Sequence, residues 1–215
     1  MKSQNDFMKN IVILISGRGS NMEALLKARL SCEVKCVISN RPDAAGLETA
    51  KMFGVDTRVL DHKEFGDRET YDKALATLVE SFKPNLVVLA GFMRILTPHF
   101  ISRFEGKILN IHPSLLPSFQ GLNTHRRAIE TGVKVHGCTV HIVTPELDDG
   151  PIIAQAATRV NQADTEDTLA SKVLKLEHHI FPKAVEWMLT GSCRLEGEKI
   201  TRDPTLESEG LLFVD

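Results

Sequence analysis

The chain has 215 residues, of which 42% are apolar and 25% charged, and its formal net charge is −2. Such a chain can fold as one domain and bury roughly 70% of its unfolded surface. Its near-neutral charge and its aromatic content of only 6% argue against nucleic acid as a partner. No apolar run approaches the ~20 residues that cross a bilayer. We therefore expect small-molecule substrates, with no nucleic acid and no membrane.

The N-terminal stretch lacks the apolar segment of a signal peptide, so we expect a cytoplasmic protein. Cys32 and Cys36 have a spacing that would suit a metal on a helix. However, the stretch around Cys36 is typical of a strand, and the sequence has no second pair of cysteines to complete a metal site. We expect reduced thiols and no metal site.

Apolar runs alternate with helical patterns over the first half of the chain, which predicts a parallel sheet with helices on both faces. In chain order the expected elements are a strand at 10–16, a helix at 21–30, a strand at 33–39, a helix at 44–54, a strand at 55–61, a helix at 68–82, a strand at 86–91, a helix at 98–104 and a strand at 108–112.

The pattern changes after residue 132. The runs 135–144 and 151–160 can lie side by side, so the later part of the sheet is expected to be mixed. A long helix over about 165–189 follows, starting after the capping candidates Asp164 and Thr165 and ending at Gly191. The polar tail has a turn signal at 196–198. The predicted fold class is α/β: a doubly wound, mostly parallel, Rossmann-like sheet with a mixed C-terminal part and a long C-terminal helix.

The first expected strand runs into the loop SGRGSN at 16–21, where a helix begins. A helix N-terminus at the carboxyl edge of a parallel sheet offers unpaired N–H groups to an anion. The sequence lacks the Lys-Ser/Thr ending of a Walker loop, and Met22 stands where a dinucleotide fingerprint needs its third glycine. The loop therefore favours a single phosphate monoester, and a tight turn that merely needs glycine is the alternative.

The strand at 108–112 carries two polar residues, Asn110 and His112, and Pro113 ends it. Residues two apart on a strand point to the same side, so an amide and an imidazole share one face. Two such donors can stabilise the oxyanion that forms when a nucleophile attacks a carbonyl. In the alternative interpretation His112 satisfies a loop carbonyl and Asn110 caps a turn.

The acidic loop TPELDDGP at 144–151 supplies a carboxylate. Either Asp148 or Asp149 could reach the imidazole and accept a proton, and spacing does not choose between them. A solvated turn before Pro151 is the alternative. Because no serine or cysteine lies in a nucleophile elbow, direct transfer between two bound substrates is favoured.

Five motifs follow one another between residue 10 and about 190: SGRGSN (16–21), LAGFMRIL (89–96), LNIHPSLLP (109–117), HGCTVHIVTPELDDGPII (136–153) and LEHHIFP (176–182). Together they resemble the phosphoribosylglycinamide formyltransferases, folate-dependent enzymes of purine synthesis. The resemblance implies attack by the amine of glycinamide ribonucleotide on the formyl carbon of 10-formyltetrahydrofolate, the co-substrate. It also implies a single formyltransferase domain, with a nucleotide-binding part at about 9–105, a catalytic and folate part at about 106–190 and an unassigned tail at 191–215.

The resemblance assigns roles to individual residues. It implies the catalytic triad Asn110, His112 and Asp148, so that the choice between the two aspartates rests on the family. The implied nucleotide-binding residues are Gly19, Ser20, Asn21 and Glu177, and the implied folate-binding residues are Arg68, Met93, Arg94, Ile95, Leu96 and Asn110. A homodimer is compatible with the sequence.

Three residues depart from the family pattern: Gln120 replaces a proline, Asn123 stands where some relatives have histidine, and Asp149 replaces a small residue. They concern the shape of the loops around the triad rather than its chemistry.

Three rival functions remain. A formyltetrahydrofolate deformylase uses water as the acceptor and carries an N-terminal regulatory domain, whereas only nine residues precede the first strand here. A methionyl-tRNA formyltransferase needs a C-terminal domain and a basic surface. A non-catalytic nucleotide or folate sensor would be expected to lack the triad.

Overall fold

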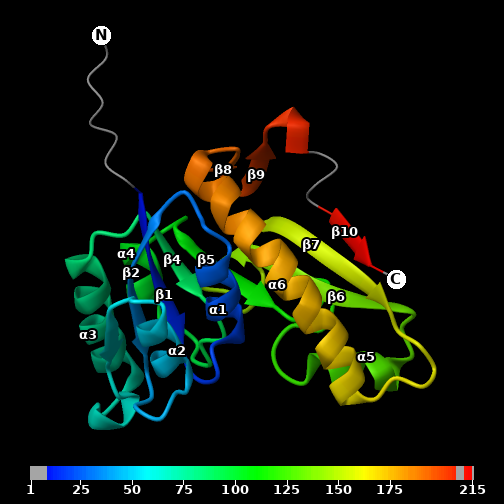
Figure 1. Cartoon of the computed structure of the whole chain (residues 1–215), viewed down its shortest axis with the longest axis horizontal. Coiled ribbons are helices and arrows are strands. Elements are labelled where there is room, and N and C mark those ends of the chain that lie inside the picture. The colour runs from blue at the N-terminus through cyan, green and yellow to red at the C-terminus, as the bar shows by residue number, and fades with distance from the viewer. Residues whose placement is uncertain (1–8, 207–210, 215) are drawn as a thin grey trace.

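The computed structural model of the chain describes residues 9–206 and 211–214. In this part of the chain one sheet of eight strands has the order β10-β7-β6-β5-β4-β1-β2-β3 (Figure 1). Its strands are β1 (Asn10–Ile15), β2 (Glu33–Ser39), β3 (Thr57–Val59), β4 (Leu86–Leu89), β5 (Ile108–His112), β6 (Val135–Ile142), β7 (Ile152–Arg159) and β10 (Leu211–Val214).

Strand direction changes once on each side of β6. From β3 to β5 all neighbours are parallel, β6 is antiparallel to both β5 and β7, and β10 is parallel to β7. The expected α/β fold with a mixed C-terminal part is confirmed. The carboxyl ends of β1, β4 and β5 consequently meet at one edge of the sheet.

Helices cover both faces of the sheet. They are α1 (Ser20–Lys27), α2 (Gly46–Met52), α3 (Arg68–Ser81), α4 (Pro98–Arg103), α5 (Thr124–Thr131) and α6 (Glu166–Thr190). Residues of α1, α2, α5 and α6 share one core with Ile11, Ile13 and Ile15 of β1, whereas α3 and α4 pack against Val12 and Leu14 on the other face. In Figure 1 the long α6 crosses in front of β6 and β7.

The ends of α6 are set by its local sequence. The Thr165 side chain accepts a hydrogen bond from the Thr168 N–H, and the Thr168 hydroxyl accepts one from the Thr165 N–H. Gly191, with φ 81°, ends the helix. This reciprocal capping satisfies N–H groups that the first turn leaves unpaired, and glycine tolerates the left-handed conformation at the other end. The predicted helix and both of its termini are therefore confirmed. No helix in the described ranges is long and apolar enough to cross a membrane.

Two parts of the fold were not assigned from the sequence. One is α5, which buries only Thr124 and Ala128 and so leaves a weak apolar pattern. The other is the tail, where β8 (Cys193–Glu196) and β9 (Lys199–Arg202) form a hairpin around the expected turn and Arg202 donates a hydrogen bond to the Ile153 carbonyl. Short 3₁₀ helices lie at His62–Glu64 and Pro204–Leu206.

The α6 cap gives a direct test of this local reading. Thr165→Ala should lower the free energy of unfolding by about 1 kcal/mol, because a buried row of α6 residues depends on the helix that the cap begins. Urea unfolding followed by circular dichroism measures the change. Thr77→Ala, at an exposed position within α3, is the control and should be neutral or slightly stabilising. Equal losses in the two variants would contradict the cap.

Candidate functional site

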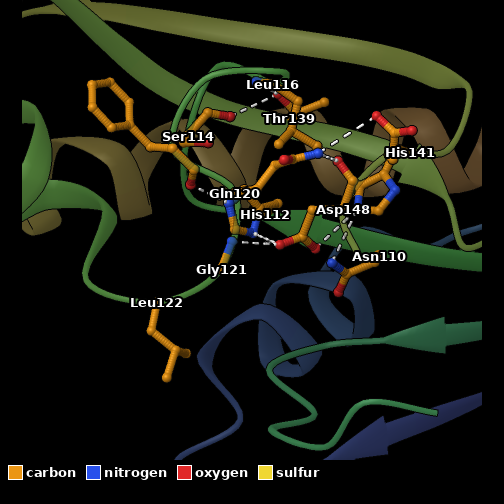
Figure 2. A network of polar contacts seen from close by, with 12 residues as sticks. Asn110, His112, Ser114, Leu116, Gln120, Gly121, Leu122, Thr139, His141 and Asp148 are labelled. Atoms are coloured by element: carbon orange, nitrogen blue, oxygen red, sulfur yellow. Dashed lines mark hydrogen bonds and ion pairs between the residues drawn. The ribbon is translucent and has the colours of Figure 1, made fainter. Parts of the chain in front are cut away.

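Asn110 and His112 lie on β5 and share one face of the sheet with Ile108, the face that carries α3 and α4. The alternate residues Leu109 and Ile111 belong to the opposite core, which anchors the strand. Because both faces hold β5 in place, the amide and the imidazole are fixed relative to each other. Their side chains converge with Asp148 in Figure 2.

Asp148 comes from the connection between β6 and β7. Since β6 is antiparallel to β5, it ends near the amino end of β5, and the connection 143–151 has to fold back to reach His112. Asp148 has φ 51°, and its Oδ2 lies 3.4 Å from His112 Nδ1. Asp149 is exposed and does not contact either polar residue of β5. Of the two candidate aspartates, Asp148 is the one that the fold brings to the imidazole.

A short segment, residues 119–121, contacts both members of the His112–Asp148 pair. His112 Nε2 donates a hydrogen bond to the Phe119 carbonyl over 3.0 Å, and the Gly121 N–H donates to Asp148 Oδ2 over 2.9 Å. Arg127 of α5 donates to the Gln120 carbonyl over 2.6 Å, which fixes the segment from outside. Each ring nitrogen of His112 thus faces an acceptor.

His141 is a member of the cluster that the sequence analysis did not assign. It lies opposite Asn110 in the β5–β6 ladder, and its Nε2 accepts a hydrogen bond from the Asn110 amide over 3.2 Å. Its Nδ1 donates to the Ile142 carbonyl over 2.9 Å. His141 Nε2 is also 3.9 Å from Asp148 Oδ1, but burial lowers the pKa of this histidine, so we treat it as a neutral acceptor and not as an ion-pair partner. The signal that identifies His141 is the antiparallel register of β5 with β6, which pairs it with Asn110.

The departures from the family pattern lie around this cluster, and two of them contact each other. The Gln120 amide donates to the Asp148 carbonyl over 3.2 Å and reaches Asp149 Oδ1 at 3.5 Å. Asn123 precedes α5 with φ 56°, a conformation that asparagine tolerates well. Gln120 and Asp149 therefore tie the loop of Asp148 to segment 119–121.

A cavity of about 840 Å³ opens between the start of α1 and the first half of α6, and it reaches Pro113, the residue that follows His112. Gly19, Ser20 and Asn21 line it. Gly19 has φ 74°, and a Cβ there would lie 3.0 Å from the Gly46 Cα, so the close approach of this loop to the start of α2 requires glycine. The N-terminus of α1 consequently faces the cavity without a side-chain cap, as an anion site would need.

Glu177 lies within this cavity and not on the surface of α6. It is 7% exposed, and its Oε2 accepts a hydrogen bond from the Asn21 amide over 2.7 Å. Burial raises the pKa of Glu177 to about 7, and the hydrogen bond from Asn21 offsets part of that increase. A carboxyl group so enclosed is well suited to hydrogen-bond a ligand hydroxyl.

The residues expected to bind folate lie in different environments. Met93 and Arg94 line the cavity, and the Arg94 guanidinium lies 4.6 Å from the centre of the Tyr71 ring. Ile95 is 52% exposed, whereas Leu96 is buried in the core with α3 and α4. Arg68, the first residue of α3, does not line the cavity. Across the described residues no group of three or more His, Cys, Asp or Glu side chains is placed to hold a metal.

Comparison with known proteins gives one consistent family. The model of the family described as formyl transferase matches residues 9–185. The phosphoribosylglycinamide formyltransferase of Escherichia coli K12 is 46% identical over 190 residues, 86% of this chain and 90% of that protein. The Haemophilus influenzae protein of the same name is 42% identical over 88% of this chain and 91% of its own length. The crystal structure of glycinamide ribonucleotide transformylase 1 from Symbiobacterium toebii matches with a TM-score of 0.89 and 42% identity, over 94% of this chain and 100% of that one.

The buried carboxyl group predicts a pH-dependent stability. Below pH 4.5 Glu177 is protonated in both states; as pH rises toward 7 only the unfolded chain ionises, so stability falls, and above 7 the full penalty remains. Glu177→Gln keeps an acceptor for Asn21 and should raise the free energy of unfolding at pH 8 by up to about 3 kcal/mol, with a much smaller gain at pH 5. Urea unfolding at both pH values measures it. Glu130→Gln, at an exposed site of α5, should show no such difference, and a gain independent of pH would contradict the shift.

Proposed function

The chain belongs to the formyl transferase family, and we propose that it transfers the formyl group of 10-formyltetrahydrofolate to the amine of glycinamide ribonucleotide. The observation that carries the proposal is the cluster of Asn110, His112 and Asp148 beside a cavity that begins at a helix N-terminus. The likeness to the phosphoribosylglycinamide formyltransferases over most of both chains supports the same substrates.

The nucleotide would occupy the cavity. Its phosphate binds the N–H groups at Gly19, Ser20 and Asn21, where the dipole of α1 favours negative charge. Glu177 then hydrogen-bonds the ribose hydroxyls from the facing helix. In this proposal a single formyltransferase domain has its nucleotide-binding part at about 9–105 and its catalytic and folate part at about 106–190, and the tail 191–215 has no assigned role.

The folate would approach the triad from the segment after β4. Met93, Arg94, Ile95 and the backbone at Leu96 form its pterin side, and the exposed Met93 and Ile95 side chains offer apolar contact to its rings. Arg68 is assigned to the acidic tail of the folate, beyond the cavity. Asn110 contributes to this site as well as to the chemistry.

The reaction would proceed by direct attack. The nucleotide amine forms a bond to the formyl carbon, and the carbonyl oxygen becomes an oxyanion that the Asn110 amide and the His112 ring N–H stabilise. Asp148, which faces His112 Nδ1, orients the imidazole and helps a proton move, through water, from the attacking amine to the departing folate nitrogen as the old carbon–nitrogen bond breaks. His141 positions the Asn110 amide by accepting a hydrogen bond from it. The Phe119 carbonyl, which accepts from His112 Nε2, competes with the oxyanion for this donor.

The decisive assay follows loss of the formyl group from 10-formyltetrahydrofolate with and without glycinamide ribonucleotide. We expect turnover that requires the nucleotide and formylates its amine in equal amount. Formate release without the nucleotide would instead make the chain a deformylase, and binding without turnover would make it a sensor.

In the same assay His112→Ala should lower kcat by at least about 100-fold, because it removes a donor to the oxyanion. Nucleotide affinity, measured by calorimetry, should change little. His179→Ala, the same change at an exposed position of α6, serves as the control. Near-wild-type turnover of the His112 variant would refute the triad.

Gln120 can be tested as a support for Asp148. Gln120→Ala removes its hydrogen bonds to the loop of Asp148 and should lower kcat by about 2- to 10-fold with the KM for the nucleotide unchanged. Because its side chain also contacts Asp149, the loss should be smaller when Asp149→Ala is already present. Gln162→Ala, in an exposed turn, is the matched control. Additive effects of the Gln120 and Asp149 changes would show that the two side chains act independently.

A further inference from the structure

Two histidines outside the triad meet near the nucleotide cavity. His125 lies in the first turn of α5 and lines the cavity, and His136 lies on β6, where it is 1% exposed. Their ring nitrogens, His125 Nδ1 and His136 Nε2, are 3.2 Å apart. Neither residue has a role in the proposed chemistry so far.

The hydrogen bonds of this pair fix which nitrogens carry protons. His136 hydrogen-bonds the Pro113 carbonyl, which can only accept, and therefore donates from its other nitrogen, Nδ1. Burial and the neighbouring His125 lower the pKa of His136 to about 4, so its ring is neutral and Nε2 is an acceptor. His125 Nδ1 must then be the donor in the bond between the rings.

Because Nδ1 of His125 is the donor, the other ring nitrogen, Nε2, is left to accept. Burial and the neighbouring His112 lower the pKa of His125, and Glu166 at the start of α6 opposes them in part. A neutral ring with its proton on Nδ1 has a bare lone pair on Nε2. This atom makes no hydrogen bond to the described part of the chain, and it is not among the enclosed polar atoms without a partner. It is therefore accessible to a ligand from the cavity that His125 lines.

Position decides which part of a nucleotide meets this lone pair. Glu177 and the start of α1 lie on the phosphate and ribose side of the cavity, whereas Pro113, also in its lining, directly follows His112. His125 is within electrostatic reach of His112. The group next to His125 is thus on the side where the formyl group is transferred.

We propose that His125 Nε2 accepts a hydrogen bond from the amide N–H of the glycinamide group, with His136 holding the ring in the tautomer that this bond needs. The inference rests on the proposed function, because it takes glycinamide ribonucleotide as the ligand. The bond would orient the glycinamide group so that its free amine points toward the formyl carbon. His125 is a substrate-binding residue in this scheme, and the triad retains the chemistry.

The tautomers can be observed in the wild-type protein. In long-range proton–nitrogen spectra of protein labelled with ¹⁵N at histidine, His125 and His136 should both carry the proton on Nδ1 and a lone pair on Nε2. Glycinamide ribonucleotide should shift the His125 Nε2 signal toward that of a hydrogen-bonded acceptor, whereas ribose 5-phosphate, which lacks the amide, should not. A proton on His125 Nε2 in the free protein would overturn the proposal.

Matched variants test the contribution to binding. A glutamine amide reaches about as far as Nε2 and an asparagine amide about as far as Nδ1, so His125→Gln should retain most of the affinity for glycinamide ribonucleotide. His125→Asn should lose about 2- to 10-fold, the effect of one neutral hydrogen bond. Affinity for ribose 5-phosphate should be equal in both.

The outcomes separate this inference from the proposed function. If wild-type protein formylates glycinamide ribonucleotide but both His125 variants bind it as wild type does, only the inference fails. An equal loss for both ligands would overturn the assignment to the amide. Absence of turnover in the wild-type protein would refute the proposed function itself, whatever the His125 variants show.

Discussion

The antiparallel pairing of β5 with β6 is the constraint on which the site depends. It places His141 opposite Asn110, so that a neutral ring nitrogen orients the amide. It also ends β6 at the far end of β5, and the connection 143–151 must turn back over the sheet, which brings Asp148 to His112. A parallel β6 would give neither contact. The loop 16–21 that leads into α1, in contrast, follows from the parallel half of the sheet, where β1 ends beside β4.

Much of the fold could be predicted because each signal was local. Each signal depends on a few adjacent residues: this holds for the buried run of β1, the reciprocal cap at Thr165 and the glycine after α6. The polar helix α5 was missed because it buries only two side chains, one turn apart. Strand order and register depend on contacts between residues far apart in the chain, which no local pattern contains.

The candidate site shows the same division. Asn110 and His112 were found because two polar residues on a buried strand conflict with their surroundings. The sequence around Glu177 does not show that this residue is buried, since a carboxylate on a helix usually faces water. Its burial follows only from the packing of α6 against α1. Burial raises the pKa of this carboxyl group, and perturbed carboxyl groups of this kind are common at functional sites. His141 is recognised only from the register of β5 with β6, and His125 only from the contact between α5 and His136 of β6.

Segment 119–121 holds the acid and the imidazole through one short piece of backbone. A displacement of that piece breaks both bonds together, because neither Phe119 nor Gly121 can move far without the other. The positions of the imidazole and of the carboxylate therefore depend on the same three residues. Arg127 holds this segment from α5, and His125 on the same helix lines the cavity. One short helix thus holds the backbone that contacts His112 and Asp148 and also forms part of the cavity wall.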